Sequence, residues 1–395
     1  MKKPAYTLVL CLLLVLLTML RSYAAAADAL PHITPAGTDT LDVPCAAAIL
    51  IDEDSGTVLY EKNADQQRPI ASITKVMTLL LTFEALSAGR IALTDTVPVS
   101  EHAYHMGGSQ IWLEPGEQMT LDDMLKSIAI GSANDAAVAV AEHLGGSEEG
   151  FVNRMNERAA ELGCTGTTFV NPNGLDTDGE QTLTTARDLA LISRELMKHE
   201  KIYDYTTTWM DTVRDGAFQL ANTNKMLRQY DGMTGLKTGY TSAAGFCISA
   251  TARRDGMDLI AVVMGEPDKE SRNADITAML NYGFAGYGMV PILSETDVLP
   301  SSSVALGKKD RVSAALADDT PVLMRKEQAG TVERTIRMEE QLSAPVEPGT
   351  KIGEVVLTSN GEEVARRDIL TAEQVEKKGI SDVYRDLLRF LLMKS

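Results

Sequence analysis

Two pairs of short, β-rich segments lie far apart in the chain and constrain its fold more than any other feature. Residues 46–52 and 57–61 flank the turn Glu53-Asp54-Ser55-Gly56, and residues 246–252 and 258–265 flank Asp255-Gly256. Each pair is typical of a β-hairpin. Because an isolated hairpin is only marginally stable in water, we expect the early and the late strands to share one antiparallel sheet.

The sequence between the two hairpins has the period of helices. Apolar residues recur at helical spacing over residues 73–86, 121–130, 134–144, 149–162 and 185–198. The predicted fold class is therefore α+β, with an antiparallel sheet flanked by helices and a helical subdomain inserted between its strands. Clefts at such boundaries commonly bind ligands, so we expect the functional site where the sheet meets the helices.

From about Pro291 onward the pattern changes to short alternating segments. These segments are residues 303–306, 321–324, 331–338 and 351–357, and they predict a small all-β domain. A length of 395 residues also favours two domains over one. We predict a main domain over residues 44–290, a β-rich domain over 291–371 and an amphipathic tail over 372–395.

The first residues are typical of a secretory signal peptide. Lys2 and Lys3 precede an apolar run from Leu8 to Leu20, and small residues follow at 24–26. We predict removal of residues 1–26, a leader over 27–43 and export to the outer face of the cytoplasmic membrane or the cell wall space. The alternative is an uncleaved anchor, but the apolar run is short for a span of about 20 residues.

The charge and the cysteines exclude several classes of protein. The formal net charge is -18, which excludes nucleic acid as a partner and favours solubility. Cys45, Cys164 and Cys247 follow the predicted signal peptide without any CxxC pair, so they form neither a complete disulfide framework nor a structural zinc site. We expect buried free thiols.

The segment Ser72-Ile73-Thr74-Lys75 has the spacing of a serine nucleophile and its base. Residues at i and i+3 share one face of a helix, so Lys75 can stand beside the Ser72 hydroxyl. A lysine accepts a proton near neutral pH only when burial or nearby positive charge lowers its pKa. A Ser-x-x-Lys match alone is weak, because chance produces it often.

Two further motifs follow in order. Ser132-Ala133-Asn134 precedes a predicted helix, where helix capping alone would also explain it. Lys237-Thr238-Gly239 continues into Tyr240 and is rarer. We interpret it as an edge strand lining a cleft, in which lysine supplies charge, threonine a hydroxyl and glycine room for a ligand to approach the backbone.

The three motifs together match the set shared by class A β-lactamases and penicillin-binding proteins. Residues 71–78, 171–175 and 235–241 make the resemblance more specific. They resemble the low-molecular-mass penicillin-binding proteins, SxxK serine peptidases that act as D-alanyl-D-alanine carboxypeptidases. The chain departs from the common pattern at Thr182, where relatives often have histidine, and its central triplet is the Ser-Ala-Asn variant.

The resemblance implies that the enzyme removes the terminal D-alanine from peptidoglycan stem peptides, without a metal or an organic cofactor, and that β-lactams inhibit it. Its nucleophile would be Ser72 and its base Lys75. The other implied roles are proton transfer for Ser132, substrate amide binding for Asn134, carboxylate binding for Lys237 and Thr238, close backbone approach at Gly239, and oxyanion stabilisation by the backbone N–H groups of Ser72 and Tyr240.

Three other functions stay open at this point. A DD-endopeptidase would use the same nucleophile on crosslinked peptides. A β-lactamase is disfavoured, because no Glu-x-x-Leu-Asn segment follows Asn134. A wall-binding scaffold without activity is disfavoured by the intact motifs.

The end of the chain has one strongly apolar helical face. Residues 382–395 predict a helix that lies in a membrane interface or, alternatively, packs on the β-rich domain.

Overall fold

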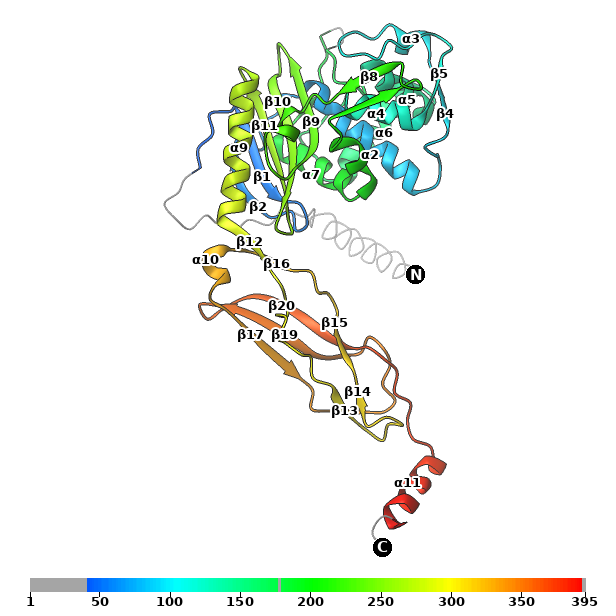
Figure 1. Ribbon diagram of the computed structural model, residues 1–395, viewed down its shortest axis with the longest axis vertical. Coiled ribbons are helices and arrows are strands. Elements are labelled where there is room, and N and C mark those ends of the chain that lie inside the picture. The colour runs from blue at the N-terminus through cyan, green and yellow to red at the C-terminus, as the bar shows by residue number, and fades with distance from the viewer. Residues whose placement is uncertain (1–40, 177–178, 393–395) are drawn as a thin grey trace, which may run out of the picture. The chain divides into compact units, whose positions relative to one another are not determined.

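The computed structural model describes residues 41–176 and 179–392, which fall into two compact units divided between Gly283 and Phe284 (Figure 1). The predicted signal peptide and most of the predicted leader lie outside the described residues. Within the described ranges, no helix combines the length and the apolar character needed to cross a membrane.

The first unit is built on a five-stranded antiparallel sheet with the order β2-β1-β11-β10-β9. Its strands are β1 (Ala47–Asp52), β2 (Val58–Lys62), β9 (Met233–Thr241), β10 (Gly245–Arg254) and β11 (Met257–Glu266). β1 pairs directly with β11, with Ile49 opposite Val262, so both ends of this unit close one sheet, as the two hairpins predict. All six residues of β1 are buried, because helices cover both faces of the sheet.

The two faces of this sheet are covered by different helices. α7 (Ala186–Met197) packs on β1 and β11, and the Ser193 hydroxyl hydrogen-bonds that of Ser249 on β10 at 2.8 Å. α9 (Lys269–Gly286) lies on the other side (Figure 1). At Gly283 a Cβ atom would lie 2.5 Å from Leu259 of β11, so the helix approaches the sheet closely there.

The helical subdomain contains the remaining predicted helices, and each of them is confirmed. They are α2 (Lys75–Ser87), α4 (Leu121–Ala129), α5 (Asn134–Gly145) and α6 (Glu148–Glu161), with α3 (Glu101–Tyr104), α8 (Tyr203–Thr206) and the 3-10 helices η1 (Ala71–Thr74), η2 (Glu200–Ile202) and η3 (Lys225–Arg228). α5 is buried over Asn134–Ala141 and forms the centre of the subdomain.

Three two-stranded ribbons complete this unit. They are β3 (Arg68–Pro69) with β6 (Leu183–Thr184), β4 (Thr96–Pro98) with β5 (Gln118–Thr120), and β7 (Met210–Val213) with β8 (Phe218–Ala221). Cys45, Cys164 and Cys247 are buried free thiols, as predicted.

The second unit is a β domain with its own apolar core, which confirms the predicted all-β character. Its core includes Ile352, Val355, Leu357 and Ile369, all fully buried. The strands are β12 (Tyr287–Val290), β13 (Ser302–Ala305), β14 (Arg311–Val312), β15 (Ala314–Leu316), β16 (Val322–Arg325), β17 (Val332–Met338), β18 (Gln341–Ser343), β19 (Lys351–Ser359) and β20 (Glu362–Thr371). A short helix α10 (Lys326–Ala329) lies between them, and α11 (Ile380–Leu392) follows them.

Candidate active site

The predicted nucleophile and base lie at the start of the first long helix. Ser72 is in η1, and Lys75 is the first residue of α2, so the two lie one helical turn apart. Lys75 Nζ is 3.1 Å from Ser72 Oγ. The i, i+3 spacing therefore places them side by side, although the first turn is a 3-10 helix and not an α-helix.

The Lys75 side chain is fully buried and contacts three oxygen atoms. Besides Ser72 Oγ, its amine donates to Asn134 Oδ1 at 2.6 Å and to the carbonyl oxygen of Asn173 at 2.7 Å. Burial is the main cause that holds the pKa of Lys75 well below its ordinary value, and the charge of Lys237 lowers this pKa further.

The second motif faces this lysine from the start of α5. The Asn134 amide group donates to the Gly107 carbonyl at 2.7 Å, and this bond orients its oxygen toward Lys75. Ser132 has a φ of +61°, a conformation that few residues other than glycine adopt. Ser132 Oγ accepts from Lys237 Nζ at 2.8 Å, and among the described hydrogen bonds it has none to Lys75.

The third motif lies on β9, at the edge of the sheet, as predicted. Lys237 Nζ also donates to the Thr238 carbonyl at 3.0 Å, and its side chain is buried. Burial, and secondly the charge of Arg272, lower the pKa of Lys237 to about 7. The Thr238 hydroxyl donates to the Thr223 hydroxyl at 2.9 Å.

Gly239 lets β9 approach the helix that carries the nucleophile. A Cβ atom at Gly239 would lie 2.5 Å from the Ile70 carbonyl oxygen, so no other residue fits without displacing η1 or β9. Tyr240 follows and is 57% exposed, and its ring stacks on that of Phe246, with ring centroids 4.2 Å apart. The backbone of β9 thus lies directly beside η1.

Three participants were not predicted from the sequence. The carbonyl of Asn173, the hydroxyl of Thr223 and the buried guanidinium of Arg272 all act on the motif lysines or on Thr238. Asn173 lies in the segment 171–175, whose resemblance to the family gives a weak signal without a role. Arg272 lies in α9, and no sequence pattern marks it.

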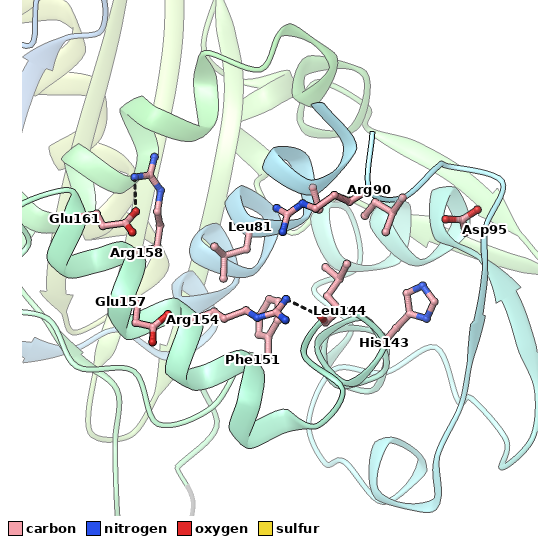
Figure 2. A pocket seen from close by; sticks show the side chains of 12 residues that line it. Leu81, Arg90, Asp95, His143, Leu144, Phe151, Arg154, Glu157, Arg158 and Glu161 are labelled. Atoms are coloured by element: carbon pink, nitrogen blue, oxygen red, sulfur yellow. Dashed lines mark hydrogen bonds and ion pairs between the residues drawn. The ribbon is translucent and has the colours of Figure 1, made fainter. Parts of the chain in front are cut away.

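One cavity lies away from these motifs. It has a volume of about 650 Å³ and is lined by residues of α2 and α6, among them Leu81, Phe151, Arg154 and Arg158 (Figure 2). No residue of the three motifs lines it. A smaller cavity of about 400 Å³ is lined by Gly107 and Asn173, whose backbone carbonyls contact Asn134 and Lys75.

One group among the described residues has the composition of a metal site. Cys45, Glu266 and Asp275 are buried together, and the Cys45 amide donates to Asp275 at 3.1 Å. Burial, and then the nearby Asp275 carboxylate, raise the pKa of Glu266 to about 7. None of the three is a motif residue, and the site chemistry described above does not involve them.

Comparison with known proteins assigns the chain to a family. Residues 34–268 match the model of the D-alanyl-D-alanine carboxypeptidase family, and residues 287–377 match the C-terminal domain of penicillin-binding protein 5. The chain is 42% identical to the D-alanyl-D-alanine carboxypeptidase DacF of Bacillus subtilis over 346 residues, which covers 87% of this chain and 88% of the relative.

Solved structures agree with the family assignment. Penicillin-binding protein 5 from Haemophilus influenzae matches with a TM-score of 0.71 and 29% identity, covering 86% of this chain and all of that one. Penicillin-binding protein D2 from Listeria monocytogenes in its ampicillin-bound form matches with a TM-score of 0.57 and 32% identity, covering 62% of this chain and all of that one. The motifs, the fold and these matches together show that the chain belongs to the D-alanyl-D-alanine carboxypeptidase family of low-molecular-mass penicillin-binding proteins.

Proposed function

We propose that Ser72 is the nucleophile of this enzyme and that Lys75 is its base. The reaction follows from the family: the chain is a serine-type D-Ala-D-Ala carboxypeptidase that acts on peptidoglycan. The Listeria relative, solved with ampicillin bound, supports the binding of β-lactams by this chain as well.

The contacts around Lys75 Nζ carry the assignment of the base. A neutral amine has two N–H donors and one lone pair. Asn134 Oδ1 and the Asn173 carbonyl can only accept, so they use both donors. The lone pair is then left for the Ser72 hydroxyl at 3.1 Å, which is the arrangement that a general base needs.

The proposed chemistry uses one acyl-enzyme. Ser72 Oγ attacks the carbonyl carbon of the penultimate D-alanine while Lys75 takes its proton. The amide bond breaks, the leaving nitrogen takes the proton of the Ser132 hydroxyl, and D-alanine departs. Ser132 regains a proton from Lys75, directly or by way of Lys237, whose Nζ donates to Ser132 Oγ at 2.8 Å, so Lys75 is neutral again. Water then hydrolyses the ester and regenerates Ser72.

The third motif and its neighbours form the proposed carboxylate site. Lys237 and Thr238 would bind the terminal carboxylate of the substrate, and the charge of Arg272 adds to the positive potential there. The backbone N–H groups of Ser72 and Tyr240 would stabilise the oxyanion. The close approach of β9 to η1 at Gly239 supports this, because it brings the two backbones together.

Covalent labelling with a fluorescent penicillin tests the nucleophile. We expect one label per folded molecule, and mass spectrometry should locate it on the peptide that contains Ser72. The Ser72→Ala variant should melt at the temperature of the wild type and take up no label. Labelling at another residue would refute the assignment, and rapid loss of the label would favour a β-lactamase.

We also propose that the chain is exported and that α11 rests in a membrane interface. None of the residues of α11 is buried, and Leu387, Leu391 and Phe390 are among its exposed apolar side chains. The predicted residue boundaries of the signal peptide, of the two domains and of the C-terminal tail also belong to this proposal. Its alternative, a helix packed on the β domain, would require burial of this face.

Sedimentation with anionic lipid vesicles tests the tail. The protein without residues 380–395 should stay in the supernatant, while the full mature chain should sediment with the vesicles. The rate of penicillin labelling should be equal for both. Sedimentation of the truncated protein would contradict the proposal, and Leu387→Glu offers a matched change that keeps the helix.

A further inference from the structure

Trp112 is presented to solvent in a backbone conformation that a bulky residue rarely adopts. It lies in the loop between α3 and β5, has a φ of +58° and is 69% exposed. A left-handed conformation costs a non-glycine residue free energy, and it persists only where the surroundings fix it. Such a residue on a fixed loop is a candidate for function.

Two side chains from other elements fix the backbone on both sides of Trp112. The buried carboxylate of Asp135 accepts from the N–H groups of Ile111 and Leu113, both at 3.1 Å. Arg214, in the turn between β7 and β8, donates to the carbonyl of Ile111 at 2.7 Å and to that of Trp112 at 3.0 Å.

The neighbouring side chains point the other way. Ile111 and Leu113 are each only 1% exposed, so they anchor the loop in the core. A salt bridge of 2.7 Å from Glu117 holds the Arg214 guanidinium in place. The indole of Trp112 is therefore held outward on a rigid support.

The same loop borders the proposed catalytic site. The carbonyl of Ser109 accepts from the N–H group of Asn134 at 2.7 Å, and Asn134 contacts Lys75. Three residues from Ser109 to Trp112 span at most about 10 Å, whereas five residues of an extended stem peptide span about 17 Å. A substrate whose last residues occupy the site is thus long enough to place the sugar at its other end near this loop.

We propose that Trp112 is a binding platform for the sugar that carries the stem peptide. One face of a pyranose ring consists of C–H groups and packs on a flat aromatic ring, while its hydroxyls need polar neighbours. The exposed residues beside Trp112, including Ser109 and Glu114, are polar. An isolated aromatic ring in polar surroundings fits a sugar, whereas a docked protein would need a broad apolar patch.

This inference rests on the proposed function, and a comparison of two substrates tests it. One substrate is the free stem pentapeptide, and the other is the same peptide attached to the disaccharide of the glycan strand. For Trp112→Ala we expect KM for the glycosylated peptide to rise about two- to twelvefold. With the free peptide, kcat/KM should stay within about twofold, and Trp112→Phe should lose less than Trp112→Ala.

Two results would contradict the proposal. One is an equal loss of activity on both substrates in Trp112→Ala, and the other is no loss of activity on either substrate. Equal loss would mean that the indole acts on the peptide or on the shape of the site. The matched control is Trp209→Phe, which changes the one other tryptophan of the chain and should affect neither substrate.

Fluorescence provides a readout that needs no turnover. In the Trp209→Phe background the emission of the protein's tryptophan comes from Trp112 alone. Titration with the peptide-free disaccharide should change this emission, and titration with the free pentapeptide should not. Unchanged Trp112 emission on addition of the disaccharide would contradict the proposed sugar platform, whether or not D-alanine is released. This readout therefore separates a failure of the sugar platform from a failure of the proposed function.

Discussion

Replacing Lys75 tests the proposed base and its geometry most sharply. Lys75→Met keeps the length of the side chain and removes the amine, together with its contact to Ser72 Oγ at 3.1 Å. General base catalysis typically contributes about 10²- to 10⁴-fold. We therefore expect the rate constant for acylation by penicillin to fall by that factor, which corresponds to about 2.7 to 5.4 kcal/mol in activation free energy.

The same change also affects stability, and the two effects need separate measurements. The amine donates to Asn134 Oδ1 and to the Asn173 carbonyl, and each buried acceptor left without a donor costs about 1 to 3 kcal/mol. A thermal melt should show a destabilised but folded protein. Stopped-flow fluorescence with a labelled penicillin, below the melting transition, gives the acylation rate. Folded Lys75→Met that acylates within about threefold of the wild type would refute the role of Lys75 as base.

Two further predictions concern the electrostatics and the packing of the site. Arg272→Met removes a charge that lowers the pKa of Lys237, so Lys237 should stay protonated to higher pH. The alkaline limb of the pH profile of kcat/KM, expected near pH 7 in the wild type, should therefore move to higher pH in this variant. An alkaline limb at the wild-type pH would contradict this prediction. Gly174→Ala should nearly abolish acylation, because its Cβ would lie 1.9 Å from the Ala71 carbonyl oxygen beside the nucleophile. Gly179→Ala is its control, since Gly179 has a similar φ of +86° but open space around it, and equal losses in both variants would refute the packing argument.

The sequence predicted those parts of the molecule that depend on local patterns. The spacing of Ser72 and Lys75 placed them one helical turn apart, because residues at i and i+3 share a helix face. The two hairpins predicted a common sheet, since their short apolar strands need partners, and β1 does pair with β11.

Features that depend on tertiary packing were not predicted. The helix α9 was not predicted, because its apolar residues do not form a clear stripe along one helix face. It also contains Gly283, at the point where it packs closely against Leu259 of β11. The carbonyl of Asn173 is a backbone group, so its role depends on how a distant loop folds against Lys75. Arg272 acts on Lys237 through space, and no local pattern can indicate that.

The left-handed conformations next to the site show the same limit. Ala71 has a φ of +50° and Ser132 a φ of +61°, although neither residue type favours that region. Local propensity would assign both to ordinary helical or extended backbone. Such disagreement between local preference and observed structure is typical of functional sites, where surrounding contacts fix an unfavourable conformation.

The central claim is that Ser72 removes a terminal D-alanine, and release of free D-alanine from a stem pentapeptide tests it most directly. The mature protein should release one equivalent of D-alanine per peptide, and Ser72→Ala should release none while remaining folded. If the folded wild type released no D-alanine, or if Ser72→Ala released it at the rate of the wild type, the account of this site would be wrong.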